Sequence, residues 1–408
     1  MIARPPVRAR PALLALVAAV LALATPAAAR DNAAVLARAI AAIEKRDLAT
    51  AETALRPLAD ADPEAAAWLG TALARLGTTA TLGEAMILLR AAAATGNARA
   101  NYELAFQTLA GVGARRDEAD AARLFRLAAE AGLARAAYNL GVLHRAGRGV
   151  PVNPTEATAW FERAAKAGDP YGAHAFARDI ELSPQAPARA TETAALYRMA
   201  AIAGHGPAAI RYGLALAEGR GVARDRKAAE AWLRHALECG YAEAALFLGD
   251  LAAPAAMQRD GKPAQAAARV AVDWYRQAAE AGIATAQVKL AGASFAGAGV
   301  DRDFPTALIW YRRAADQGTA EAQYVLGVWW SGGVVGPIDT VEGHKWLLLA
   351  ERQGHANATK VRLKALETLS AADLRRAEAA ANAFRPRLER VGRPDDEAGP
   401  LQPPKKIP

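Results

Sequence analysis

The chain is 408 residues long, more than one hydrophobic core usually organises, which favours several domains or one elongated repeat array. Apolar residues make up 53% and charged residues 23%, and this balance excludes an intrinsically disordered or collagen-like chain. The formal net charge of +8 is spread out, without Lys/Arg clusters interleaved with aromatic residues, so we expect no nucleic-acid partner. Only 6% of the residues are aromatic and Ala is abundant, which predicts an all-α protein with closely packed helices.

The amino-terminal segment has the pattern of a secretory signal. Three arginines and no acidic residue occur within residues 1–10, an apolar run covers 11–24, and a small-residue cleavage motif ends at Ala29. The apolar run is shorter than the roughly 20 residues that cross a bilayer as a helix. We therefore predict a signal peptide over 1–29 that is cut after Ala29. The mature protein is then expected to be periplasmic or secreted, with no membrane span once the signal is removed.

Residues 30–64 are predicted to form N-terminal capping helices. The stretch is amphipathic, and Pro57 lies near a helix boundary. The exposed face of a terminal repeat must be made soluble, so capping helices are expected before the first unit of a repeat array.

A repeat of fixed length covers residues 65–354. Each unit closes with a glycine, and these closing glycines are Gly96, Gly132, Gly168, Gly204, Gly240, Gly282, Gly318 and Gly354. Neighbouring closing glycines are 36 residues apart except for one spacing of 42, whose extra residues we place in an insertion near 252–265. This period is typical of helix–turn–helix solenoids, so we predict a right-handed α/α superhelical solenoid of about eight repeats. A glycine suits the end of each second helix because the left-handed cap conformation costs little without a Cβ.

A large apolar residue stands eight positions before each closing glycine. The eight residues are Leu88, Leu124, Trp160, Leu196, Trp232, Trp274, Trp310 and Trp346. A helix that fills the groove between successive units needs one bulky side chain per unit. We therefore interpret these residues as structural anchors of the repeat core rather than as a catalytic or cofactor-binding set.

The clearest unit runs from Gln287 to Gly318, and another runs through Leu140-Gly141, then Gly147-Arg148-Gly149-Val150, and ends with Trp160-Phe161-Glu162-Arg163-Ala164-Ala165-Lys166-Ala167-Gly168. This pattern resembles the Sel1-like repeat, a relative of the tetratricopeptide repeat with a longer turn between its helices. The resemblance implies a protein-interaction scaffold found in bacteria and eukaryotes, and the secreted bacterial members resemble regulators or assembly factors rather than enzymes. Two units depart from the pattern. In one, Ser183-Pro184-Gln185-Ala186-Pro187 replaces the Gly-x-Gly-Val turn, and the other is the lengthened unit after Gly249.

After the last closing glycine, residues 355–385 are predicted to form C-terminal capping helices. Ser370 begins the second of these helices with a side chain suited to cap it, and Arg385-Pro386 ends it. Residues 386–408 have the composition of a disordered tail.

The sequence offers no established catalytic motif. No two of the six histidines stand at i, i+4, and none of the four serines lies in a Gly-x-Ser-x-Gly or Ser-x-x-Lys motif. Cys239 is the only cysteine and replaces an Ala of the sister units, so we interpret it as a small buried residue. No metal, cofactor or enzymatic activity is predicted. The alternative is a cell-wall-associated enzyme or a binder of peptidoglycan or β-lactams, which would need His144, His174 and nearby carboxylates around one pocket.

One position in the first helix of each unit changes chemistry from repeat to repeat, being Trp68, Glu103, Asn139, Ala175, Arg211, Phe247, Lys289 and Val325 in turn. Packing residues of a solenoid must repeat, whereas residues facing its groove are free to specialise. Our candidate partner-binding residues are Trp68, Glu103, Asn139, Arg211, Phe247, Lys289 and, in a separate apolar segment, Trp330. A solvated stripe under no constraint is the alternative interpretation. The prediction is an exported, monomeric scaffold that binds a protein or extended peptide on its concave face, with a purely structural spacer as a further possibility.

Overall fold

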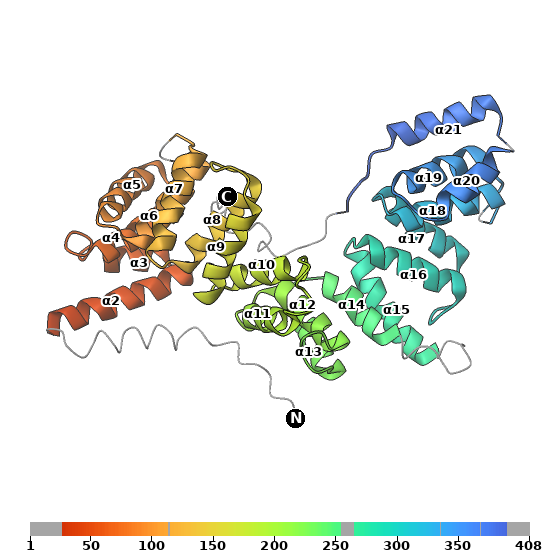
Figure 1. The fold of residues 1–408 in the computed structure, drawn as a ribbon. Helices are drawn as coiled ribbons and strands as arrows, with labels where there is room; N and C mark the ends of the chain where they lie inside the picture. Colours follow the sequence, from red (N-terminus) through yellow and green to blue (C-terminus); the bar gives the residue numbers. More distant parts are fainter. Residues whose placement is uncertain (1–26, 113–114, 254–264, 335, 368, 390–408) are drawn as a thin grey trace. The chain divides into compact units, whose positions relative to one another are not determined.

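The computed structural model describes residues 27–389 apart from 113–114, 254–264, 335 and 368. Within these residues the chain forms twenty α-helices and no strand, which confirms the predicted all-α class (Figure 1). The predicted signal core and the insertion near 252–265 fall mostly outside the described residues. No helix in the described part is long and apolar enough to cross a membrane.

Sixteen of the helices pair into eight helix–turn–helix repeats. The first helices are α4 (Pro63–Leu76), α6 (Ala98–Ala110), α8 (Ala134–Ala146), α10 (Pro170–Glu181), α12 (Gly206–Glu218), α14 (Glu243–Ala252), α16 (Ala284–Ala296) and α18 (Ala320–Gly332). The second helices are α5 (Thr79–Ala94), α7 (Glu118–Glu130), α9 (Pro154–Lys166), α11 (Ala190–Ile202), α13 (Arg226–Glu238), α15 (Gln265–Glu280), α17 (Phe304–Asp316) and α19 (Thr340–Arg352). Before them lie α2 (Ala27–Glu44) and α3 (Leu48–Leu55), and after them α20 (Ala358–Leu366) and α21 (Ala371–Ala383).

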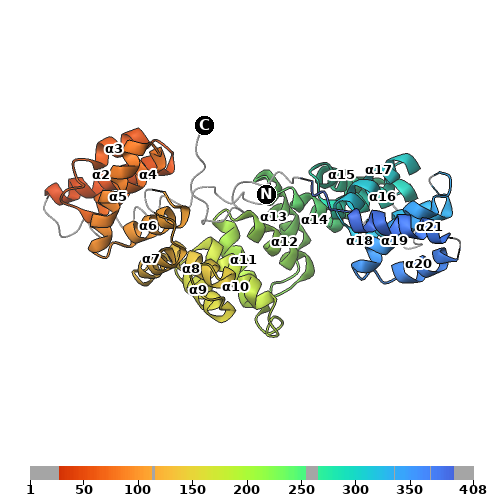
Figure 2. The ribbon, with the colours of Figure 1, turned by 90° about the horizontal axis from the view of Figure 1, so that it is seen from above.

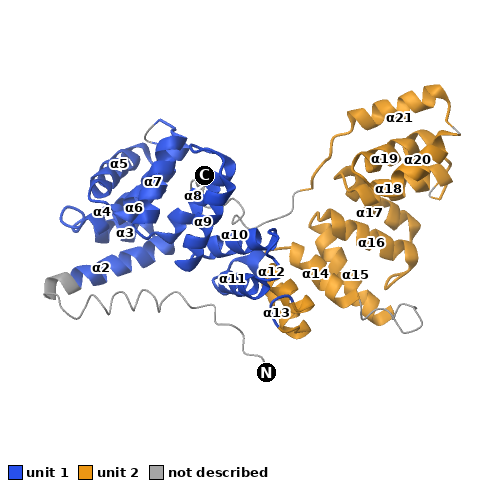
Figure 3. Ribbon diagram, viewed as in Figure 1, with its two compact units in different colours: residues 1–209, 220–222, 395–408 blue, residues 210–219, 223–394 orange. Residues whose placement is uncertain are grey.

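The chain divides into two compact units, which are described here one at a time (Figure 3). Unit 1 holds residues 1–209, 220–222 and 395–408, and unit 2 holds 210–219 and 223–394. Each helix from α3 to α11 and from α14 to α19 packs on the helix that precedes it in the chain, as Figures 1 and 2 show from two directions. The repeat core therefore forms between sequence neighbours, as expected for an array of helix pairs.

Polar residues at the helix starts set the length of the second helices. Asp117, Asn153, Asp225, Asp303 and Asp339 each accept a hydrogen bond from a backbone N–H in the first turn of the helix that follows. These side chains satisfy amide groups that have no partner inside the helix. The closing glycines end the same helices in the left-handed region, with φ between 77° at Gly354 and 96° at Gly318, as predicted.

The second glycine of the Gly-x-Gly turn has a steric role that the sequence did not reveal. A Cβ on Gly149 would lie 1.9 Å from the carbonyl oxygen of Glu118, at the start of the second helix of the preceding repeat. The φ of Gly149 is also 68°, a conformation that a side chain disfavours. Only glycine allows two neighbouring repeats to approach this closely.

The predicted core anchors are displaced by one residue in the structure. Trp160 and Trp346 are buried, but Trp232, Trp274 and Trp310 are only half-buried. The residue that follows this position is buried in every repeat: Leu89, Phe125, Phe161, Tyr197, Leu233, Tyr275, Tyr311 and Leu347. The residue seven positions before the closing glycine is thus the regular core anchor.

Two of the half-buried indoles serve a second purpose, because cationic side chains lie over them. Arg313 lies 4.5 Å from the ring centre of Trp310, and Arg234 lies 4.9 Å from that of Trp274. A cation over the face of an indole is attracted by the negative electrostatic potential of that face. The tryptophan positions therefore form the rim of the packed core and hold charged groups there.

Candidate partner-binding surfaces

The predicted recognition row on the first helices is only partly exposed. Asn139 is fully buried and Glu103 is 8% exposed, so the expectation that these two side chains face a free groove was wrong. Asn139 lies beside the buried Tyr102. A pattern of variable residues cannot distinguish a surface from a packed contact. A direct role of either residue in binding is not supported by this placement.

The remaining members of the row are more accessible. Arg211 is exposed, while Phe247 and Lys289 are half-buried. Lys289 Nζ lies 2.9 Å from a carboxylate oxygen of Asp250. Trp68 is also half-buried. The binding role of these residues stays a prediction.

Arginines link the first helices of neighbouring repeats in unit 1. The guanidinium of Arg99 lies 4.2 Å from the ring centre of Trp68, and that of Arg135 lies 4.1 Å from the ring centre of Tyr171. Arg135 Nε also donates to Asp169 over 2.5 Å. Asp169 is 5% exposed and caps α10 by accepting from the backbone N–H of Gly172. The sequence analysis did not predict these arginine contacts between repeats, although the 36-residue spacing of Arg99 and Arg135 is a detectable signal.

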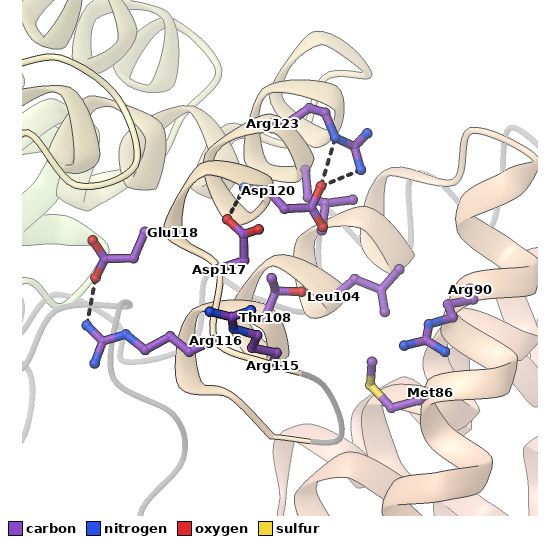
Figure 4. Close-up of a pocket in the computed structure, with 11 residues that line it drawn as sticks. Met86, Arg90, Leu104, Thr108, Arg115, Arg116, Asp117, Glu118, Asp120 and Arg123 are labelled. Atoms are coloured by element: carbon purple, nitrogen blue, oxygen red, sulfur yellow. Dashed lines mark hydrogen bonds and ion pairs between the residues drawn. The ribbon is translucent and has the colours of Figure 1, made fainter.

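A polar cavity of about 730 Å³ lies in unit 1 between α5, α6 and the start of α7 (Figure 4). Its wall combines arginines with carboxylates, namely Arg90, Arg115, Arg116, Arg123, Asp117, Glu118 and Asp120. Figure 4 shows the carboxylates turned toward local partners rather than toward one another.

Those local partners account for each carboxylate of the cavity. Asp117 accepts from two backbone N–H groups at the start of α7, both at 2.9 Å. Asp120 pairs with Arg123 at 2.7 Å. The hydrogen bond from Arg116 holds the pKa of Glu118 below its ordinary value. An ionised, paired carboxylate is a poor proton donor, so this cavity is not arranged for general acid catalysis.

The histidines named for the enzymatic alternative lie in separate environments. His144 on α8 is buried with its Nε2 3.4 Å from Arg126, and burial lowers its pKa. His174 on α10 packs its ring 4.6 Å from that of His205. The three cavities lined by residues of α5 to α7, of α13 to α15 and of the start of α19 have no histidine in their walls. His144 and His174 therefore line none of these three cavities.

Cys239 is exposed, so its prediction as a buried residue was wrong. It follows the last residue of α13, just before the closing glycine, where the chain turns away from the core. The equivalent alanines Ala131, Ala167 and Ala203 are exposed as well. The small residue at this place reflects a tight turn and not a buried site.

Trp330, the second predicted apolar candidate, is half-buried in unit 2. It lines a cavity of about 450 Å³ with Ile338, Val341 and other residues at the start of α19. Its indole N–H is buried and makes no hydrogen bond to any residue in the described part of the chain. The wall of this cavity thus mixes apolar side chains with Asp339, Thr340 and Asp373.

The carboxyl-terminal segment of unit 2 lies across the repeats, which differs from the predicted disordered tail. Phe384 packs its ring 5.6 Å from that of Trp346, and residues 384–389 continue in extended form past α17 (Figure 1). We call residues 384–389 the C-terminal strap. The strap ends at Glu389, whose carboxylate pairs with Arg313 on α17. Residues 390–408 of the predicted tail lie outside the described residues.

Comparison with known proteins identifies the repeat. The Sel1 repeat model matches residues 98–133, 134–169, 206–241, 242–283, 284–319 and 320–355, more than half of the chain. Residues 170–205, the unit with the divergent turn, are not matched but still form a helix pair, α10 and α11. A comparison with curated proteins found no match.

Solved structures that are similar to the chain include the following two. One is a protective antigen of uropathogenic Escherichia coli strains that displays an SLR fold; it is 24% identical with a TM-score of 0.70, over 88% of this chain and 76% of that one. The other is a Sel1 repeat protein from Oxalobacter formigenes, 29% identical with a TM-score of 0.56, over 76% of this chain and 89% of that one. The matched segments coincide with helix pairs of the structure, and most of them have the 36-residue period found in the sequence. This chain belongs to the Sel1 repeat family.

Proposed function

We propose that this protein is a non-enzymatic scaffold, exported from the cytoplasm, that binds an extended segment of a partner protein along its repeats. Sel1 repeat proteins generally act as protein-interaction scaffolds. The observation that carries the proposal is the C-terminal strap, an extended segment held by a repeat through both backbone and side-chain hydrogen bonds. A surface that holds one extended chain has the groups that hold another.

Export is proposed from the amino-terminal pattern, namely the arginines, the apolar run and the small residues that end at Ala29. Amino-terminal sequencing of the protein recovered from an envelope or secreted fraction tests it. The expected first residue is Arg30. A protein that retains residues 1–29 in the cytoplasm contradicts this part of the proposal.

The biological role that fits these features is regulation of envelope signalling or assistance in envelope assembly, with the protein acting as a monomer. Affinity capture from the envelope fraction, using the mature protein, tests the scaffold proposal. We expect one specific partner with the unaltered protein and its loss with Arg211→Ala, Phe247→Ala and Lys289→Ala combined. The matched control is Arg276→Ala, an exposed residue on the second helix α15 that pairs only locally with Asp273. Equal capture by all variants would rule out the first-helix row as the partner surface.

A further inference from the structure

We infer that Arg313, Gln287 and Gln317 form a binding site for an acidic side chain in an extended peptide, and that Glu389 of the C-terminal strap is the chain's own competing occupant. The site lies on the repeat formed by α16 and α17, in unit 2. This inference rests on the proposed function, because it names the chemistry of a partner segment and a device that regulates its access.

The contacts at Glu389 are those of a carboxylate-recognition site. Arg313 donates through Nε to Oε1 at 2.9 Å and through Nη2 to Oε2 at 2.5 Å. Gln287 Nε2 donates to Oε2 at 3.0 Å. A bidentate arginine fixes the plane of a carboxylate, and the amide adds a third donor. The site thus selects for a carboxylate and for its orientation.

The backbone of the strap is recognised as well. The N–H of Glu389 donates to Gln317 Oε1 at 3.2 Å, and the N–H of Arg387 donates to the carbonyl oxygen of Asp316 at 2.8 Å. By contrast, the side chain of Leu388 is 79% exposed. Every extended peptide carries such N–H groups, so the site needs only an acidic residue in an extended segment and not this particular sequence.

The receiving groups are held in place by the repeat itself. Gln317 Nε2 donates to Gln287 Oε1 at 2.9 Å and to the carbonyl oxygen of Gly282 at 3.0 Å. Gln287 Nε2 donates to the carbonyl oxygen of Ala279 at 3.2 Å, and the guanidinium of Arg313 lies over Trp310. A site whose donors are already oriented loses little conformational entropy when a ligand binds.

Comparison of equivalent positions shows that this combination occurs in one repeat. The position of Arg313 is held in chain order by Ala91, Leu127, Arg163, Met199, His235, Gln277, Arg313 and Leu349. The next repeat keeps the glutamine pair, since Gln353 Nε2 donates to Gln323 Oε1 at 2.7 Å, but it has the buried Leu349 in place of Arg313. The glutamine pair alone therefore serves to join the two helices of a repeat. Only in the repeat that also has Arg313 does the pair form part of a carboxylate-binding site.

The C-terminal strap is held weakly enough to be replaced by a free peptide. Its carboxylate remains 27% exposed, and between Phe384 and Glu389 no side chain of the strap is buried. Phe384 stays packed on Trp346, so residues 385–389 can leave while their tether holds. A short tether presents Glu389 at an effective concentration of the order of millimolar, and a free peptide must compete with that value. Removing the carboxylate of Glu389 therefore exposes the site to a free peptide.

The test uses a fluorescent synthetic peptide with the sequence of residues 384–389 and blocked ends, titrated into the full chain. We expect the Glu389→Gln protein to bind it at least about tenfold more tightly than the unaltered protein, because the internal competitor is weakened. Adding Arg313→Ala to Glu389→Gln removes the binding, and a peptide with Gln at its last position does not bind. Gln353→Ala in the sister pair leaves the affinity unchanged.

Arg313→Lys in the Glu389→Gln background guards against misfolding, because it keeps the charge but loses the bidentate contact. It is expected to bind with intermediate affinity and an unchanged circular dichroism spectrum. Equal peptide affinity of the Glu389→Gln protein and the unaltered protein, or binding that does not depend on Arg313, overturns the inference and leaves the strap as a structural brace. A concentration-dependent dimer that Glu389→Gln abolishes overturns it too, because the occupant is then a second copy.

The outcomes separate this inference from the scaffold proposal. Peptide binding that follows the expected pattern, together with no captured envelope partner, supports the site and contradicts the scaffold role. Partner capture that is insensitive to Arg313→Ala, together with absent peptide binding, supports the scaffold role and contradicts this site.

Discussion

The two units differ in their polar contacts although the helices pair in the same way. In unit 1, charged groups cross the repeat junctions, as in Arg135 with Asp169 and Arg145 with Asp179. In unit 2, Lys289 and Asp250 also pair across a junction, and pairs of neutral amides lie within single repeats, Gln287 with Gln317 and Gln323 with Gln353. The junction charges of unit 1 are neutralised inside the array, whereas Arg313 in unit 2 takes its carboxylate from a segment outside the repeats. The polar layer thus varies between units while the apolar layer stays the same.

The largest effects are expected where the units agree. Phe161 in unit 1 and Leu347 in unit 2 occupy the same core position and are almost completely buried. We expect Phe161→Ala to lower the free energy of unfolding by about 3–5 kcal/mol and Leu347→Ala by about 2–5 kcal/mol. Urea unfolding followed by circular dichroism measures both. A loss below about 1 kcal/mol in either unit would break the comparison, because the apolar layer would then differ between the units.

The next effect compares an ion pair between two repeats with a neutral amide pair within one repeat. Arg135→Ala leaves the carboxylate of Asp169, which is 5% exposed, without its cation, and we expect a loss of about 3 kcal/mol. Gln317→Ala removes neutral hydrogen bonds and should cost about 1 kcal/mol. Urea unfolding of the two variants under the same conditions compares their losses in the free energy of unfolding. Adding Asp169→Asn to Arg135→Ala should recover part of the loss, and an unchanged loss would argue against charge as its cause.

A smaller effect compares two half-exposed arginines. Arg145 pairs with Asp179 inside unit 1, and Arg313 pairs with Glu389 of the strap. Replacing either arginine by alanine should change the free energy of unfolding by less than about 1 kcal/mol. Only Arg313→Ala should release the strap, seen as faster amide hydrogen exchange at Arg387 and Glu389, whose N–H groups are bonded in the docked form. Equal exchange in both variants would show that the ion pair does not hold the strap.

The smallest effect is the pH dependence of strap docking in unit 2. The hydrogen bond from Arg313 lowers the pKa of Glu389 below its ordinary value of 4.5, with a further contribution from Gln287. A lowered pKa means that docking is favoured by the ionised form, so its contribution is complete above 4.5 and is lost as the pH falls through the lowered value. Glu280 is the other charged group that acts on Arg313. Nuclear magnetic resonance of the strap between neutral and acidic pH measures the release, and Glu389→Gln should remove the dependence.

Much of the fold could be predicted because the same local sequence signals recur in each repeat. Closing glycines such as Gly168, Gly204, Gly240, Gly282 and Gly318 mark left-handed caps, and their spacing gives the helix pairs directly. The core anchor was predicted one residue too early. The prediction chose the larger side chain, often a tryptophan, whereas the smaller residue that follows it points into the core. A helix places adjacent residues about 100° apart, so one residue decides between the core and its rim.

The candidate site was less predictable, because its parts come from distant positions. Variation along the row that includes Asn139 suggested exposure, yet that residue is fully buried. Glu389 lies 76 residues from Arg313 and follows a helix, α21, whose packing on α19 sets the course of the strap. No local pattern connects these positions.

The sequence by itself determined the helix pairs, their period and their caps, since hydrogen bonds and glycine backbone preferences act between residues close in the chain. The tertiary structure alone decided which polar side chains are buried and which cation meets which carboxylate. Burial depends on the size of side chains contributed by neighbouring repeats, and an ion pair depends on distances between segments that meet only after the helices have packed.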